Sequence, residues 1–124
     1  MSVPKTMFQL SGRGYAPANL AHATLVIIDA QKEYLSGPLA LTGMAEAVAN
    51  IQQLLAAARA AGRPIVHVHH LGTVGGLFDP QGERGEFIPG LEPLSDETLI
   101  GKLLPSAFHG TPLENACRTL APWT

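Results

Sequence analysis

The chain of 124 residues is 46% hydrophobic and 15% charged, with a formal net charge of −2. This length suits one small domain, and the composition is that of a folded protein. The sequence has no basic run, no apolar stretch near about 20 residues and no apolar leader, so we expect neither a nucleic-acid nor a membrane partner. The lone cysteine excludes an intramolecular disulfide, and we expect a cytoplasmic protein.

The first 22 residues are polar and are interrupted by glycine and proline, which predicts an extended arm or loop. We expect this arm to pack on the body through its larger apolar side chains, which are Met7, Phe8, Leu10 and Tyr15. Residues 23–29 then run apolar up to Asp29. Such a run predicts a strand covered on both faces, as in a parallel sheet, and its three consecutive β-branched residues favour a strand over a short buried helix.

The next predicted element is a helix. An apolar stripe at helical spacing consists of Met44, Val48, Ile51, Leu55 and Ala58. Thr42 is the expected N-cap, Gly62 the expected C′ residue, and Pro64 prevents continuation. Residues 65–70 read as a second strand, so strand, helix and strand form a right-handed βαβ unit. The ends of its parallel strands, at Asp29 and at His69 and His70, then share one edge of the sheet.

Residues 71–97 form a long loop rich in glycine and proline. We expect a lid or a substrate-binding segment, with a disordered excursion as the alternative. Residues 98–100 predict a third strand that ends near Lys102. Thr111, Pro112 and Glu114 predict the capped start of a further helix.

Two polar residues are the candidates for chemistry. In open α/β sheets the ligand crevice lies outside the carboxyl ends of the strands, where Asp29 is placed. Lys102 reaches the same edge if its strand is parallel to the first. It would hold Asp29 ionised and offer a cation to a substrate. The alternatives are a strand-ending or turn-capping aspartate and a surface lysine.

The order and spacing of residues 25–31, residues 62–70, Lys102 with residues 106–108, and Thr111 with Leu113 resemble the isochorismatase-like cysteine hydrolase family. The resemblance runs from about residue 23 to the end of the chain. It implies an α/β fold with a three-layer, Rossmann-like parallel sheet and helices on both faces. The 124 residues would be a single domain that is incomplete at its C-terminus, equivalent to the first two-thirds of the family's length.

The resemblance also implies an Asp-Lys-Cys triad. Asp29 matches the aspartate that accepts the thiol proton, and Lys102 matches the lysine that stabilises charge. The thiolate attacks an amide carbonyl, and water releases the acid from the thioester. The family cysteine follows a further strand, which would lie beyond residue 124. Cys117 instead falls on the apolar stripe of the last predicted helix, with Leu113, Ala116 and Leu120, where a free cysteine is a small hydrophobe.

This shortfall leaves three interpretations: a piece of a longer protein, for example one cut by proteolysis, a gene product that ends here, and a shortened homologue with another role. An uncovered parallel sheet is rare, which favours the first. We therefore expect residues 25–28 and 65–68 to present an apolar face that nothing in the 124 residues can fully cover.

The expected substrate pocket is aromatic. Tyr34, Phe78 and Phe87 could form a wall against a small planar substrate, or could pack in the core or the lid. His69 and His70 line the pocket or orient the loop, with a structural role as the alternative. Family nicotinamidases bind a metal through an Asp-x-His segment at the end of the second strand and a further histidine, and residues 67–72 of this chain have no aspartate at that spacing. We expect no metal and no cofactor.

The sequence thus predicts a hydrolase that acts on a small carboxamide or a related C–N bond and forms homo-oligomers. One alternative is vinyl-ether hydrolysis of the isochorismatase type, which uses the same aspartate and lysine without a nucleophilic cysteine. The other is a non-catalytic binding or oligomerising module.

Overall fold

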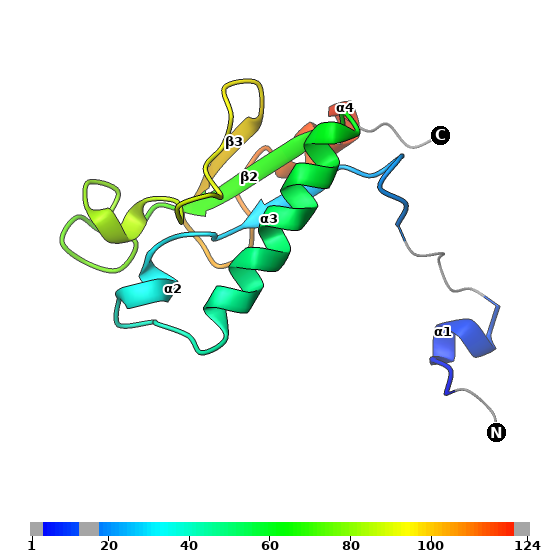
Figure 1. Cartoon of the computed structure of the whole chain (residues 1–124), viewed down its shortest axis with the longest axis horizontal. Coiled ribbons are helices and arrows are strands. Elements are labelled where there is room, and N and C mark those ends of the chain that lie inside the picture. The colour runs from blue at the N-terminus through cyan, green and yellow to red at the C-terminus, as the bar shows by residue number, and fades with distance from the viewer. Residues whose placement is uncertain (1–3, 13–17, 121–124) are drawn as a thin grey trace.

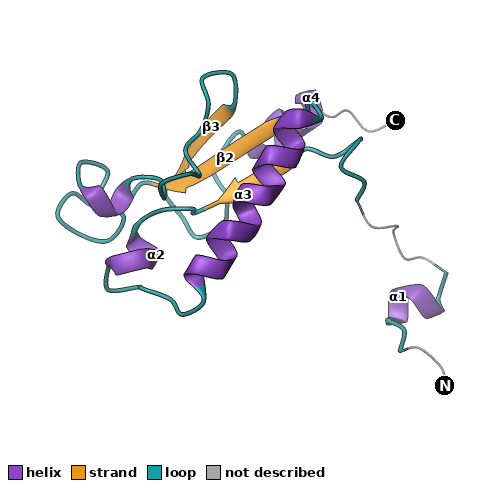
Figure 2. Ribbon diagram, viewed as in Figure 1, coloured by secondary structure: helices purple, strands orange, loops and turns teal. Residues whose placement is uncertain are grey.

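The computed structural model describes residues 4–12 and 18–120. Three parallel strands form one sheet in the order β1 (Leu25–Ile28), β2 (Ile65–His70) and β3 (Thr98–Lys102) (Figure 1). The helices are α1 (Met7–Leu10), α2 (Glu33–Ser36), α3 (Met44–Ala60) and α4 (Leu113–Leu120), with a 3₁₀ turn, η1 (Glu83–Gly85), in the long loop (Figure 2). The expected α/β class with a parallel sheet is confirmed.

The β1–α3–β2 unit forms because the two strands pair in parallel, from Leu25 opposite Ile65 to Ile28 opposite Val68. The helix ends as its sequence predicts. Gly62 adopts a left-handed φ of 65°, and the N–H groups of Gly62 and Arg63 donate to the carbonyls of Arg59 and Ala58 at 3.1 and 2.9 Å. This pair of bonds is a Schellman motif, which needs a residue that tolerates positive φ.

The predicted caps are partly wrong. The N-cap of α3 is Gly43, at φ 75° and without a side-chain hydrogen bond, because the chain makes a left-handed turn that leaves Thr42 one residue too early. At α4, Thr111 Oγ1 accepts from the N–H of Leu113 at 3.3 Å, as a cap does. Glu114 bonds Arg118 at 2.8 Å, while the Thr111 N–H donates to the Phe108 carbonyl, so the reciprocal half of the capping box is not formed.

Two hydrophobic clusters lie on opposite faces of the sheet. On one face α3 packs Leu55 and Ala58 against Ile27 and Ile65. On the other, α4 and the loop before it pack onto a cluster of Val66, Val68, Ile100, Ala107 and Leu113. Figure 1 shows α3 running across the front of the strands. The expected layer on each face is therefore present.

The expectation of an uncovered apolar face is wrong for β2, because helices cover both faces of this central strand. Ile65 is 4% exposed, and Val66 and Val68 are fully buried. It holds only at β1, an edge strand in this sheet, where Ile28 is 47% exposed.

The N-terminal arm does not pack as expected. Met7 and Leu10 lie on α1 and are 83% and 69% exposed, because this short helix stands away from the body (Figure 1). Tyr15 and the side chain of Phe8 lie outside what the structure describes. In the described part of the chain, no helix has the length and apolar character needed to cross a membrane.

Candidate active site at the carboxyl edge of the sheet

Asp29 is the first residue after β1 and has a left-handed backbone, with φ 59°. Its N–H donates to the Val68 carbonyl at 2.9 Å, which continues the pairing with β2 by one step. A non-glycine residue with positive φ is uncommon and carries some strain. The backbone turns away from the sheet at Asp29. The Asp29 side chain therefore lies at the edge of the sheet and is partly open to solvent.

Lys102 is the last residue of β3 and is only 3% exposed. Its Nζ lies 3.1 Å from Asp29 Oδ2 and donates to the carbonyl of Pro105 at 2.8 Å. Lysine is seldom this buried unless its charge is compensated. The structure thus brings the two candidate catalytic residues together, and the surface-lysine alternative is excluded.

The two oxygens of the Asp29 carboxylate have different surroundings. Oδ2 faces Lys102, whereas Oδ1 is buried and has no hydrogen-bond partner in the described part of the chain. A carboxylate that pairs with a lysine through one oxygen and has no hydrogen-bond partner at the other has an acceptor oxygen for a nearby donor. Asp29 and Lys102 together can supply a base and a fixed positive charge.

The three histidines of β2 have different surroundings. His67 and His69 share the face that contacts Phe87, and His70 points to the other side against Phe78, as their alternation predicts. His67 is fully buried, and its Nε2 lies 2.8 Å from Glu97 Oε1. Its role is structural, because this bond links β2 to the end of the long loop.

His69 and His70 are half-buried at the edge that carries Asp29. Burial lowers the pKa of the His69 imidazole, and the nearby Asp29 carboxylate opposes that effect. His69 stacks on Phe87, with ring centroids 5.3 Å apart and an interplanar angle of 20°. A neutral imidazole at this position can either donate or accept a hydrogen bond.

The predicted aromatic residues meet at the same edge. The Phe78 ring makes edge contacts with Tyr34 at 5.3 Å and with His70 at 5.1 Å. Burial, followed by the charges of Asp29 and Glu33, raises the pKa of the Tyr34 phenol. Phe78 is buried and Phe87 half-buried, so these rings also pack against the loop that carries them.

Gln31 was not predicted from the sequence, although it is fully buried beside Asp29. Its amide nitrogen donates to the carbonyls of His70 at 2.9 Å and Gly85 at 3.0 Å, and its oxygen accepts from the His70 N–H at 2.9 Å. Glu33 was missed as well and is also fully buried. The available signal was the series Asp29, Gln31 and Glu33, polar residues at alternate positions directly after an apolar strand.

The long loop is tied to this polar segment. Gln31 forms an isolated antiparallel bridge with Phe87, the Lys32 N–H donates to the Glu86 carbonyl, and the Ile88 N–H donates to the Ala30 carbonyl. A disordered excursion is therefore excluded. The loop holds its two phenylalanines against the carboxyl edge of the sheet.

Cys117 lies on α4 and packs, half-buried, against the cluster that contains Val66 and Ile100. The predicted stripe is confirmed at Leu113 and along this contact, but Leu120 at the end of the helix is 37% exposed. In the described part of the chain, no group of three or more histidine, cysteine, aspartate or glutamate side chains is placed to hold a metal ion.

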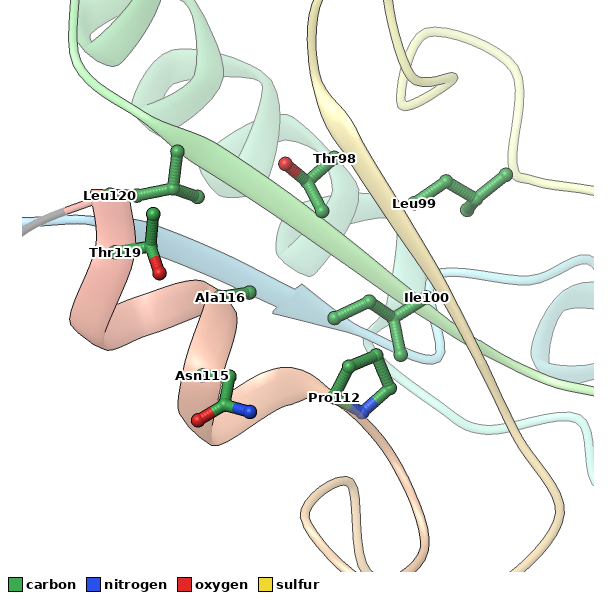
Figure 3. Close-up of a pocket in the computed structure, with 8 residues that line it drawn as sticks. All are labelled: Thr98, Leu99, Ile100, Pro112, Asn115, Ala116, Thr119 and Leu120. Carbon is green, nitrogen blue, oxygen red and sulfur yellow. The ribbon is translucent and has the colours of Figure 1, made fainter.

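A separate hollow of about 390 Å³ lies between α4 and β3. Figure 3 shows Ala116 and Leu120 of α4, with Pro112 just before the helix, beside Thr98 and Ile100 of β3. None of the predicted site residues lines it. Its lining is mostly apolar, and it lacks the charged pair found at Asp29.

A family model for the isochorismatase domain matches residues 23–122. The chain belongs to the isochorismatase family. Among solved structures, an isochorismatase from Pseudomonas putida KT2440 is 66% identical with a TM-score of 0.91, over 95% of this chain and 61% of that chain. A cysteine hydrolase from Pseudomonas syringae pv. phaseolicola is 27% identical with a TM-score of 0.74, over 86% of this chain and 58% of that one.

A curated isochorismatase-family protein of Bacillus subtilis is 37% identical over 92 residues, which are 72% of this chain and 51% of that protein. The chain thus spans about half the length of this curated relative. The isochorismatase family is a family of hydrolases, and this chain has the α/β fold of the family, a parallel sheet with helices on both faces.

Proposed function

We propose that this chain supplies the aspartate–lysine half of a hydrolase site that cleaves a small carboxamide or a related C–N bond. The observation that carries the proposal is the buried Lys102 beside Asp29 at 3.1 Å, with Asp29 Oδ1 left unpaired. This arrangement suits a base that takes the proton of a cysteine thiol, and a lysine that stabilises both the aspartate and the charge that develops on the substrate.

The proposed reaction then has two stages. The thiolate attacks the amide carbonyl carbon, the C–N bond breaks, and the amine leaves with a proton returned by Asp29. Water adds to the resulting thioester, and Asp29 accepts a proton from that water as the C–S bond breaks and the acid departs. None of these steps needs a cofactor. The residues that we propose to surround the substrate are Tyr34, His69, His70, Phe78 and Phe87.

The nucleophile is proposed to lie after residue 124, and the topology supports its place. α3 and α4 lie on opposite faces of the sheet. Because βαβ crossovers are right-handed, a strand that followed α4 would return past β2 and lie beside β1. Its carboxyl end would then be next to Asp29, at the point where strand order reverses and α/β folds bind their ligands.

The direct test begins with the mass of the denatured protein purified from its natural source. A mass above 13.1 kDa would show that the protein extends beyond residue 124. Release of ammonia from a panel of small carboxamides would then support the proposal. Cys117→Ala is the matched control and should retain activity, because Cys117 is half-buried on α4 and packs against a hydrophobic cluster. Loss of activity in Cys117→Ala alone would assign the nucleophile to α4 and contradict the proposal.

Vinyl-ether hydrolysis is the second candidate, and the observation that favours it is the 66% identity to a protein described as an isochorismatase. It uses Asp29 and Lys102 without a thiol. Turnover of isochorismate that survives replacement of every cysteine would support it over amide cleavage. A folded protein of 13.1 kDa that turns over neither substrate would favour a non-catalytic module.

We further propose a cytoplasmic homo-oligomer. Several apolar side chains around β3 and the loop after it are exposed, among them Leu99 at 51%, Leu103 at 74% and Phe108 at 60%. Burial of such side chains between copies would be favourable. Light scattering of the purified protein tests this, and a monomer at high concentration would contradict it.

A further inference from the structure

Glu33 is a charged residue in a place that normally disfavours charge. Its side chain is fully buried. Oε1 accepts a hydrogen bond from the Phe78 N–H at 2.9 Å, and Oε2 lies 3.6 Å from Arg84 without a hydrogen-bond partner in the described part of the chain. Burying a carboxylate costs free energy unless it is well paired. The single strong contact of Glu33 is therefore with the backbone of Phe78.

The backbone of Phe78 is itself unusual. Its φ is 51°, a left-handed conformation that bulky side chains rarely adopt. The Phe78 carbonyl accepts from the Gly72 N–H at 3.0 Å, so both of its backbone polar groups are engaged. This conformation places the ring between Tyr34 and His70, at 5.3 and 5.1 Å. The bond from Glu33 holds the strained residue whose ring closes this side of the site.

The Glu33 carboxylate fits where it does because residue 37 is a glycine. A Cβ on Gly37 would lie 1.5 Å from Glu33 Oε2, so only glycine leaves room for it. The φ of Gly37 is −84°, which alanine accepts. A Cβ on Gly37 would also lie 2.8 Å from the Glu33 carbonyl, so Gly37→Ala would displace the carboxylate and shift the end of α2 slightly, while the φ of residue 37 stays allowed.

We propose that Glu33 is a positioning residue of the substrate pocket: its buried carboxylate fixes the left-handed backbone of Phe78 and so sets the aromatic wall that faces a planar substrate. The inference rests on the proposed function for its claim that this wall contacts substrate. The contact between Glu33 and Phe78 stands independently of that function.

The test compares amide hydrogen exchange in the unsubstituted chain, Glu33→Leu, Glu33→Gln and Gly37→Ala. We expect exchange of the Phe78 N–H to accelerate by about tenfold or more in Glu33→Leu and Gly37→Ala, while Val66 and Val68 in β2 keep their rates. Glu33→Gln retains an acceptor oxygen and should rescue most of the protection. Glu86→Gln, an exposed carboxylate change in the same loop, is the matched control and should leave the Phe78 rate unchanged.

Two results would overturn the proposal. One is an unchanged Phe78 rate in both Glu33→Leu and Gly37→Ala. The other is an equal acceleration at Val66 and Val68, which would show that Glu33 only stabilises the fold. Since the two variants reach the carboxylate from different residues, failure of one to fold leaves the other to decide.

Nicotinamide, as a planar carboxamide probe, links the wall to substrate. We expect it to shift the ring signals of Phe78 and Tyr34, and its affinity to fall about fivefold or more in Glu33→Leu and Gly37→Ala but to be kept in Glu33→Gln. If nicotinamide leaves these signals unchanged in the unsubstituted chain, the proposed substrate class is wrong, and the exchange rates alone decide the role of Glu33.

Discussion

Asp29 and Lys102 form an ion pair of 3.1 Å although their strands do not touch. β2 lies between β1 and β3, and the ion pair of Asp29 and Lys102 spans the carboxyl end of β2. The register explains this geometry, because Lys102 pairs with His70 at the end of β2 while Asp29 bonds the carbonyl of Val68. The charge pair therefore depends on the alignment of all three strands.

Replacement of Lys102 should remove turnover. Lys102→Met keeps the length of the side chain but leaves Asp29 without its cation, and we expect kcat/KM to fall by about 10²–10³-fold. Asp29→Asn removes the base and should cost at least about 10²-fold. Steady-state kinetics on the protein that carries the proposed nucleophile measure both. Lys32→Met, which breaks only ion pairs with Glu83 and Glu86, is the control, and equal losses there would contradict a special role for Lys102.

The His69 imidazole should titrate below its ordinary pKa of 6.5, because burial disfavours its charged form. Since the unfolded chain binds the proton more readily, His69 lowers stability as pH falls below about 6.5. Asp29→Asn removes a nearby negative charge, so the pKa of His69 should fall further. Ring-nitrogen NMR titration of both proteins measures this shift. A rise in the His69 midpoint on Asp29→Asn would contradict the geometry.

Glu97 should contribute stability that disappears in acid. Two hydrogen bonds from Arg59, with further bonds from the Leu94 N–H and His67, lower the pKa of Glu97 from 4.5 to about 2. The contribution is complete above about pH 4.5 and is lost as pH falls toward 2. Glu97→Gln should therefore lower the free energy of unfolding by about 2–3 kcal/mol at pH 7.

Urea unfolding at a series of pH values checks the prediction for Glu97. The difference between Glu97→Gln and the unsubstituted chain should shrink steadily below pH 4.5. Glu46→Gln, an exposed change on α3, controls for the loss of one carboxylate. A difference that stays constant down to pH 2 would mean that charge plays no part in the Glu97 contacts.

Adjacent leucines on α3 offer a matched test of the first core cluster. Leu55 is 1% exposed and packs against the sheet, whereas Leu54 is 50% exposed. Leu55→Ala should cost about 2–5 kcal/mol of stability, as buried truncations do. Leu54→Ala should stay within about 0.5 kcal/mol. Similar midpoints in urea for the two variants would show that α3 is packed in another rotation.

Much of the sheet could be predicted from the sequence because its strands are short apolar runs that end in polar residues. β2 and the C-terminal end of α3 follow directly from residues 65–70 and Gly62. The start of α3 could not be predicted, since a left-handed turn at Gly43 competes with the better cap at Thr42 and depends on where the preceding loop enters.

The site was only partly predictable for a similar reason. Asp29 and Lys102 each follow an apolar run, and the parallel arrangement brings them to one edge. Gln31 and Glu33 gain their importance from partners that lie 39 and 45 residues away in sequence, at His70 and Phe78. The local pattern shows only polar residues at alternate positions after an apolar strand, and it does not indicate which distant residues they contact. The prediction that Met7 and Leu10 pack on the body was wrong, because apolar side chains in a short arm do not by themselves specify a partner.

The side chain of Gln31 has a consequence for how the sheet ends. Its amide donates to the C=O of His70 and accepts from the N–H of His70, the two groups that the main chain of a neighbouring strand would otherwise pair. Asp29 still donates its N–H to the Val68 carbonyl. Beyond that bond the Gln31 side chain, and not the main chain, pairs with His70, which allows the backbone to turn at Asp29. Glutamate would lack the donor for this pairing, and leucine would lack both halves. One side chain thus takes the place of main chain at the end of β1, and it permits the turn that holds the Asp29 carboxylate, 21% exposed, at the edge of the sheet.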